Sequence, residues 1–144
     1  MASISSTISY TLAPSDDVLY LTGTDNINGN GNYNANIVYG NAGNNIINGL
    51  QGADTVYGGA GNDTIYAGGN DLVDGGDGDD QIVIANSVSD AVDITYSSSD
   101  SITLSVPADY SGDEEPELVQ DGDDVHVVLN GEVLAVLRDT EVKD

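Results

Sequence analysis

Apolar and polar residues alternate along the middle of the chain in a pattern that returns every nine positions. In sequence order the copies are YLTGTDNIN (20–28), GNYNANIVY (31–39), GNAGNNIIN (40–48), GLQGADTVY (49–57), GGAGNDTIY (58–66), AGGNDLVD (67–74) and GGDGDDQIV (75–83). Gly29 and Asn30 are inserted after the first copy, and the copy at 67–74 is one residue short. A fixed short period predicts a solenoid, in which each coil stacks on the next.

Each nonapeptide divides into a glycine-rich turn of six residues and a strand of three. Side chains alternate between the two faces of a strand, so position eight faces one way and positions seven and nine face the other. Position eight is aliphatic throughout and predicts the core: Ile27, Val38, Ile47, Val56, Ile65, Val73 and Ile82. At the outward position nine, Tyr39 and Tyr57 lie one coil apart on one face. They are either a binding stripe or, as we favour, strand-forming residues that shield the backbone.

Position six carries the candidate chemistry. It reads Asp25, Asn36, Asn45, Asp54, Asp63, Asp71 and Asp80. Two nonapeptides make one turn of a flattened coil, so the loops 40–45, 58–63 and 75–80 stack on one edge and 31–36, 49–54 and 67–71 on the other. Carboxylates stacked about 4.8 Å apart repel one another strongly unless a cation lies between them. Calcium fits best, because it accepts six to eight oxygen ligands in flexible geometry.

The predicted calcium ligands are carboxylates of position six and oxygens of the tight turns. They are Asp54, Asp63, Asp71, Asp80, Gly52, Gly59, Ala60, Gly61, Gly69, Gly76, Asp77 and Gly78. The best site is expected between Asp63 and Asp80, and the next between Asp54 and Asp71. Asn36 and Asn45 are uncharged, so their loops are expected to stack through amide hydrogen bonds without metal.

The amino-acid composition excludes several classes of binding partner. The chain has 144 residues, 25 acidic and two basic side chains, and a net charge of −23. Two basic residues cannot neutralise phosphates, so we expect neither nucleic-acid binding nor attachment to an anionic membrane. No apolar run is long enough to span a membrane. Cysteine is absent and histidine occurs once, at His126, so softer metals are poor candidates.

The segments before and after the repeats are predicted to cap the two ends of the roll. Ile4, Ile8, Tyr10 and Leu12 alternate in the segment 1–19, which we interpret as N-terminal cap strands before the roll at 20–83. Strands are predicted at 92–96 and 101–106, and an acidic loop at 107–117. The segment 123–139 holds two apolar runs joined by Asn130 and Gly131, a strong hairpin signal. Residues 84–144 are therefore expected to be a C-terminal β capping region.

The complete copies GGAGND (58–63) and GGDGDD (75–80) resemble the haemolysin-type calcium-binding repeat of the RTX family. The resemblance covers residues 20–83 and is strongest over 49–83. It implies an all-β fold, a right-handed parallel β-roll or β-solenoid. It also implies a secreted bacterial protein that folds outside the cell, where calcium is plentiful, and export by type I secretion.

These observations favour a calcium-dependent structural module that stabilises or displays its parent protein. The alternative is a polysaccharide-binding or adhesive module, attached to a carbohydrate-active enzyme or an adhesin. Ice binding is less favoured, since position three offers no rank of Thr. We expect no enzymatic activity, because no nucleophile–histidine–acid set or phosphate loop is visible. The expected partners are calcium ions and, under the alternative function, an extracellular polysaccharide, and the expected state is a monomer.

Overall fold

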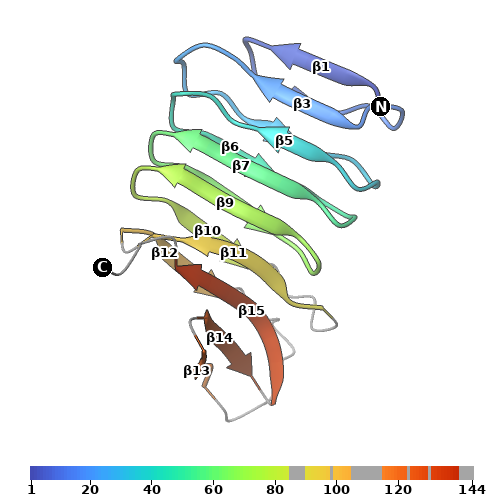
Figure 1. Cartoon of the computed structure of the whole chain (residues 1–144). Coiled ribbons are helices and arrows are strands. Elements are labelled where there is room, and N and C mark those ends of the chain that lie inside the picture. The colour runs from blue at the N-terminus through green and yellow to red at the C-terminus, as the bar shows by residue number, and fades with distance from the viewer. Residues whose placement is uncertain (85–89, 98, 105–114, 123, 130, 140–144) are drawn as a thin grey trace.

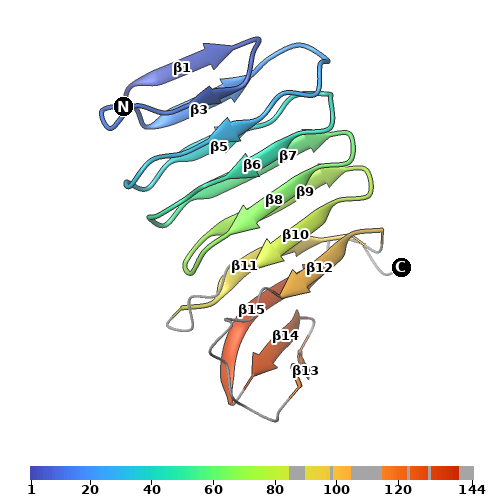
Figure 2. The ribbon, with the colours of Figure 1, turned by 180° about the vertical axis from the view of Figure 1, so that it is seen from behind.

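The computed structural model of the chain is an all-β solenoid (Figure 1). It describes all residues except 85–89, 98, 105–114, 123, 130 and 140–144. Its strands form two sheets that lie back to back, and the chain passes from one sheet to the other through turns at the two edges (Figures 1 and 2). The predicted fold class is confirmed, and no helix that could cross a membrane occurs in the described part of the chain.

The two sheets take alternate strands of the coil. In spatial order the first sheet holds β1 (Ser3–Ser6), β3 (Val18–Leu21), β5 (Ile37–Tyr39), β7 (Thr55–Ala60), β9 (Leu72–Asp77), β11 (Val92–Tyr96), β15 (Glu132–Asp139), β14 (Asp124–Leu129) and β13 (Glu117–Asp121). The second sheet holds β12 (Ser101–Leu104), β10 (Gln81–Ile84), β8 (Thr64–Ala67), β6 (Ile46–Asn48), β4 (Gly29–Asn30) and β2 (Tyr10–Thr11).

The core is a double column of position-eight side chains. In the first sheet Val38 pairs with Val56 and Val56 with Val73, all in parallel register. In the second sheet Ile47, Ile65 and Ile82 pair in the same way. All six side chains are fully buried. Complete burial of an aliphatic side chain contributes about 1.5–3 kcal/mol, so this column is a substantial part of the apolar stabilisation of the roll.

The short copy at 67–74 changes the length of one coil without shifting its strands. Partners are eighteen residues apart from Val38 to Val56, but seventeen from Val56 to Val73 and from Ile65 to Ile82. The missing residue is therefore taken from a turn, and the aliphatic column continues through it. A turn can absorb the deletion, whereas one residue lost from a strand would move every following side chain to the opposite face.

The predicted position eight of the first nonapeptide is wrong. Gly29, rather than Ile27, pairs with Ile47 and holds position eight. A Cβ on Gly29 would lie 3.1 Å from Leu19 Cδ2, which shows that this glycine faces the core and that Leu19 fills the space beside it. Ile27 is still buried in the core. The N-terminal strands β1 and β2 extend the two sheets in parallel, β1 beside β3 and β2 beside β4.

At the C-terminal end the coil continues beyond the last nonapeptide. Strands β11 and β12 pair in parallel with β9 and β10, as expected from the strand-like segments at 92–96 and 101–106. The hairpin strands β14 and β15 are antiparallel, and β15 attaches to β11. The edge strand β13 was not predicted. The acidic loop at 107–117 lies almost wholly outside the described residues.

A row of stacked tyrosines follows the outer face of the first sheet. The rings of Tyr20 and Tyr39 lie 4.9 Å apart, and those of Tyr39 and Tyr57 lie 5.0 Å apart. Their planes are nearly parallel, at 3° and 9°. The predicted pair at Tyr39 and Tyr57 is thus present, and Tyr20 extends it into the preceding coil.

Candidate metal centre

The turns stack on two edges, as the sequence predicts. The loops 40–45, 58–63 and 75–80 lead from the first sheet to the second, and the loops 31–36, 49–54 and 67–71 lead back. Position six ends each loop and is buried: Asn36, Asn45, Asp54, Asp63, Asp71 and Asp80 are each at most 2 % exposed. Asp25 does not belong to this series, because Ile27 lies opposite Asn45 and its carbonyl accepts the Asn45 amide.

A hydrogen-bond ladder connects position six of one coil to the next. On the first edge the Asn45 N–H donates to Asp63 Oδ1 at 2.7 Å, and the Asp63 N–H donates to Asp80 Oδ1 at 2.8 Å. On the other edge Asn36 donates to Asp54 Oδ1 at 2.7 Å, and Asp54 donates to Asp71 Oδ1 at 2.8 Å. Each carboxylate therefore holds its neighbouring coil in register with one oxygen.

The second carboxylate oxygen has no such partner in three loops. Asp54 Oδ2, Asp63 Oδ2 and Asp80 Oδ2 are buried and accept no hydrogen bond. Removing an ionised carboxylate from water costs several kcal/mol unless it is paired or bound to a cation. An unpartnered buried carboxylate oxygen, repeated in three loops, is the arrangement that a hard cation would stabilise.

Burial shifts the titration of these groups. It raises the pKa of Asp54 from the ordinary value of 3.8 to about 7 and that of Asp63 to about 6. In both cases a backbone hydrogen bond opposes the shift, and the next carboxylate of the ladder, Asp71 or Asp80, adds to it. Burial also raises the pKa of Asp71 and of Asp80. The charged form is therefore disfavoured in this fold in the absence of a cation.

Glycine at position one leaves room beside the unpartnered oxygen. A Cβ on Gly58 would lie 2.5 Å from Asp63 Oδ2, and it would also collide with the carbonyl oxygen of Gly75 in the next coil. A Cβ on Gly49 or Gly75 would collide in the same way with Oδ2 of Asp54 or Asp80. Asp63 Oδ2 and the Gly75 carbonyl oxygen thus lie on the same side of Gly58, and calcium accepts oxygens of both kinds.

Carbonyl oxygens of positions two and four also point between coils. Those of Gly59 and Gly61 lie where a Cβ on Gly76 and Gly78 would be, and the latter two have φ of 93° and 131°. Only glycine tolerates both the close approach and this backbone conformation. Gly52 lies against the Asn34 carbonyl on the other edge in the same manner.

Asp71 differs from the other three aspartates. Its Oδ2 accepts the N–H of Gly68 at 2.6 Å while its Oδ1 accepts that of Asp54, so both oxygens are hydrogen-bonded. The missing residue of the short copy shortens this loop and lets the carboxylate close it. Gly69 lies against the backbone of Asp90 instead of a second nonapeptide turn.

The asparagine loops satisfy their own hydrogen bonds. Asn45 Oδ1 accepts the N–H of Asn41, and Asn45 Nδ2 donates to the carbonyl of Ile27 and to Asn41 Oδ1. Asn36 Oδ1 accepts the N–H of Asn32 in the equivalent position of its loop. The expected amide hydrogen bonds are therefore present.

Of the predicted ligands, only the four aspartates at position six belong to the ladder, and one further member was missed. The Ala60 N–H donates to the Asn41 carbonyl at 3.1 Å, and Asp77 is exposed at the end of β9. The missed residue is Asp100, whose Oδ1 accepts the Asp80 N–H at 3.2 Å. The spacing Asp100-Ser101-Ile102 repeats Asp80-Gln81-Ile82, a signal that the absence of glycine hid.

Among the described residues, no group of three or more His, Cys, Asp or Glu side chains converges as a metal cluster. A cation in these loops would therefore need backbone carbonyls or water in addition to one or two carboxylates. Calcium accepts such mixed oxygen ligands, and the unpartnered oxygens and glycine spaces fit it.

No curated protein matches the chain. The family model of the RTX calcium-binding nonapeptide repeat, in four copies, matches residues 30–65 and 49–82. These are the residues that build the ladders and the glycine spaces described above. Such repeats are known calcium-binding motifs. They form a structural module that is typical of secreted bacterial proteins. The stacked loops of residues 30–82 are thus similar to the RTX calcium-binding nonapeptide repeat.

Proposed function

We propose that the chain is a calcium-dependent folding module of a secreted bacterial protein, which stabilises or displays the rest of that protein outside the cell. The observation that carries the proposal is the set of unpartnered, buried oxygens on Asp54, Asp63 and Asp80. Hydrogen bonds hold the other oxygen of each carboxylate in place, so the three groups are oriented before a cation arrives.

The balance of charge explains why the cation would control folding. Seven carboxylates lie in residues 54–83, and the whole chain carries only two basic side chains. Self-repulsion and burial of the aspartates oppose the compact state, while a core without Phe or Trp offers limited apolar burial. Calcium bound only to the folded state would stabilise it by mass action.

Circular dichroism of the metal-free chain tests the proposal directly. We expect a largely disordered spectrum without calcium and a β spectrum in millimolar calcium, with magnesium at the same concentration much less effective. Equal β content and equal melting temperature in chelator and in calcium would refute a calcium-dependent fold.

The sites follow from the same geometry. We assign the main one to Asp63 with the facing loop 75–80, where the Asp63 carboxylate and the Gly75 carbonyl oxygen both lie close to Gly58. The second belongs to Asp54, and it is weaker because Asp71 across the coil already accepts two hydrogen bonds. Carbonyls of Gly59, Gly61, Gly76 and Gly78 are the natural additional ligands.

The segment after the repeats closes the roll in this proposal. Val92 and Ile94 are buried, and β11 pairs with β9, so residues 84–144 cover the end of the core. Truncation after Ile84 should expose Val73 and Ile82 and produce aggregation or loss of calcium-dependent folding. Normal folding of the shortened chain would show that the segment is a separate unit.

The structure favours this function over polysaccharide binding. Tyr39 is stacked between Tyr20 and Tyr57, so both of its faces and one face of each neighbour are covered instead of being open to a sugar. A glycan array probed in calcium separates the two functions, since an adhesive module would retain a specific polysaccharide and a folding module would not.

A further inference from the structure

The N-terminal end of the roll exposes strand edges. The first sheet ends at β1 and the second at β2, and each of these strands pairs with a described strand on one side only (Figures 1 and 2). The carbonyls of Ala2 and Ser6 accept N–H groups of the next coil. Because the backbone groups of successive residues alternate between the two edges of a strand, those of Ser3 and Ser5 point away from the roll.

The core also ends there, and no described strand lies beyond it. Ile4 pairs with Leu19 at the end of the first sheet, and Tyr10 pairs with Gly29 at the end of the second. Ile4 and Tyr10 pack against the core but are only partly buried. Ile8, in the connection between β1 and β2, is 69 % exposed. The end therefore presents apolar side chains beside open strand edges, which solenoids normally cover.

The opposite end of the first sheet is better protected. Strands β15 and β14 continue the sheet and add the buried Ala135 and Val127 to the core. The edge strand β13 carries Glu117 and Asp121, and charged side chains on an edge strand hinder pairing with another molecule. Strands β1 and β2, with the sequences SISS and YT, contain neither a charged residue nor a proline. They are therefore open to further pairing.

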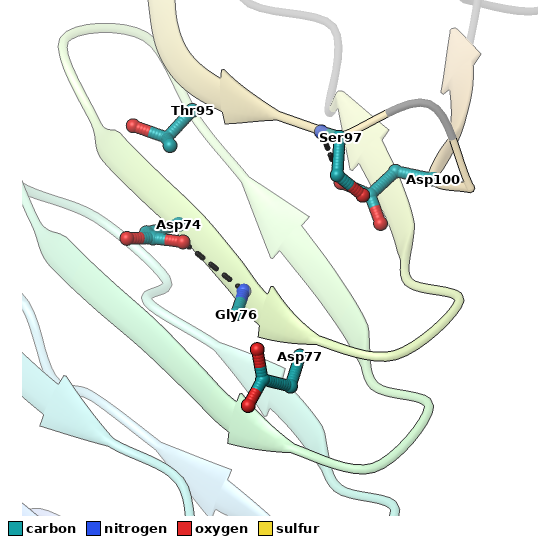
Figure 3. A pocket seen from close by; sticks show the side chains of 6 residues that line it. All are labelled: Asp74, Gly76, Asp77, Thr95, Ser97 and Asp100. Carbon is teal, nitrogen blue, oxygen red and sulfur yellow. Dashed lines mark hydrogen bonds between the residues drawn. The ribbon is translucent and has the colours of Figure 1, made fainter. Parts of the chain in front are cut away.

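The distribution of charge favours a second copy as the partner at this end. Only three of the 25 acidic residues lie in residues 1–53, and the carboxylate of one of them, Asp17, lies 3.8 Å from the N-terminal amine. All the others lie in later segments, where Asp74, Asp77 and Asp100 line one pocket (Figure 3). Two chains that each carry a net charge of −23 therefore repel least when their N-terminal ends meet and their acidic parts lie farthest apart.

We propose that the N-terminal end of the roll pairs with the same end of a second copy of this chain. A two-fold axis relates the copies, so β1 runs antiparallel to β1 of the partner copy and the nine-stranded sheet continues across the contact. Ser3 and Ser5 supply the backbone groups that pair, and the contact covers Ile4, Ile8 and Tyr10.

This dimer is expected to be weak and reversible. Strands of four and two residues, in two layers about 10 Å apart, present a small end, and small interfaces are typical of transient contacts. The inference departs from the monomer expected from the sequence. It goes beyond the proposed function and does not depend on it, because the strands that pair precede the aspartate loops.

Light scattering after size-exclusion chromatography measures the mass of the full chain in calcium over a range of concentrations. We expect monomer to convert reversibly to dimer as the concentration rises. High salt should favour the dimer, because it screens the repulsion between two chains of net charge −23. A chain that stays monomeric at every concentration and salt would overturn the proposal and leave this end to a different partner. Assemblies that grow beyond the dimer would also overturn it, since they indicate head-to-tail contacts.

Ser5→Lys is the main variant, because it places two lysines beside each other at the paired edges. Gln81→Lys is the matched control, since it makes the same change of net charge at an exposed position on β10, inside the second sheet. Ser5→Pro is a second variant, which removes an N–H that points away from the roll. Circular dichroism in calcium confirms that each variant is folded.

We expect Ser5→Lys to raise the dissociation constant of the dimer at least about tenfold, although it lowers the net negative charge of the chain. Ser5→Pro should act in the same direction. Gln81→Lys should leave the dimer unchanged or make it slightly tighter. If folded Ser5→Lys and Gln81→Lys dimerise equally well, the contact does not involve β1 and the proposal is wrong.

Discussion

The asparagine loops and the aspartate loops of the roll share a backbone but differ in how position six is satisfied. Asn45 uses its oxygen for the N–H of Asn41 and its nitrogen for the carbonyl of Ile27. Asp63, one coil later, accepts the N–H of Asn45 with one oxygen and leaves the other buried and unpartnered. Replacement of one nitrogen by one oxygen thus separates a turn whose amide is fully hydrogen-bonded from a turn with a buried, unpartnered oxygen.

The same repeat backbone therefore accommodates two kinds of turn, which differ in the residue at position six. Where the amide is present, donors and acceptors balance within the protein, as buried polar groups require. Where the carboxylate is present, an acceptor is in excess and charge accumulates. We therefore expect the roll from Gly31 to Asn48 to depend little on calcium, and the roll from Gly49 onwards to depend on it strongly.

Filling the glycine space should produce the largest effect. Gly58→Ala would place a methyl group against Asp63 Oδ2 and the Gly75 carbonyl, so we expect loss of calcium binding at that loop and destabilisation of at least about 1–3 kcal/mol. Gly68→Ala is the control, because the nearest atoms would lie 3.7 Å from its Cβ. Melting curves with and without calcium measure both, and equal effects of the two variants would contradict the assigned space.

Exchange of the position-six residues tests the comparison itself. Asp63→Asn should raise the stability of the metal-free chain and lower its response to calcium, because the unpartnered oxygen becomes an amide. Asn45→Asp should do the reverse and create a new calcium-dependent turn. The calcium midpoint for folding is the measurement, and we expect several-fold shifts in opposite directions. Shifts of the same sign would show that amide and carboxylate loops bind calcium alike.

The stability of the metal-free chain should fall as the pH rises from about 4 to about 7. Burial raises the pKa of Asp54 to about 7 and of Asp63 to about 6, so the folded chain binds more protons than the unfolded chain across this window. Protonation therefore stabilises the fold at the acid end, and this stabilisation is lost as the pH passes the folded pKa values. Because the metal-free chain is expected to be largely disordered near pH 7, the gain of β structure on acidification, followed by circular dichroism, measures it.

The double variant Asp54→Asn with Asp63→Asn should flatten that dependence, whereas Asp79→Asn should leave most of it. In saturating calcium the direction should reverse, since protons compete with the metal for the same oxygens. A metal-free chain whose stability increases between pH 4 and pH 7 would contradict the assigned shifts.

The smallest effect is expected at the C-terminal hairpin. Arg138 bonds Asp93 at 2.7 Å and Asp124 at 2.9 Å, and so connects β11, β15 and β14. Its side chain is half exposed, where ion pairs contribute little. Arg138→Gln should lower the melting temperature slightly, more at low salt than at high salt, without changing the number of calcium ions. A changed calcium stoichiometry would show that the hairpin contributes to the sites.

The sequence was sufficient for the coil and its edges. Aliphatic position eight, outward positions seven and nine, and the two stacks of turns follow from a nine-residue period and the alternation of strands. The period also located Asp54, Asp63, Asp71 and Asp80 on their edges. These features depend only on the spacing of residues along the backbone, and the nine-residue period of the sequence gives that spacing directly.

Features that depend on side-chain competition were not predictable in this way. The closure of Asp71 onto the Gly68 N–H follows from a loop that is one residue short, and its hydrogen bonds are visible only in three dimensions. Asp100 was missed because its loop has no glycine, although its spacing to Ile102 matches that of Asp80 to Ile82. Position eight of the first coil is Gly29 and not Ile27, and the packing of Gly29 against Leu19 is visible only in the structure.

The tyrosine row gives the molecule an optical reporter. Parallel rings about 5 Å apart couple their electronic transitions, so Tyr20, Tyr39 and Tyr57 should give a near-ultraviolet dichroism signal that exists only while three successive coils are wound. Tyr20 and Tyr39 precede the aspartate loops, and Tyr57 lies within them. During removal of calcium, a partial loss of this signal would record the roll unwinding from its aspartate half towards its asparagine half.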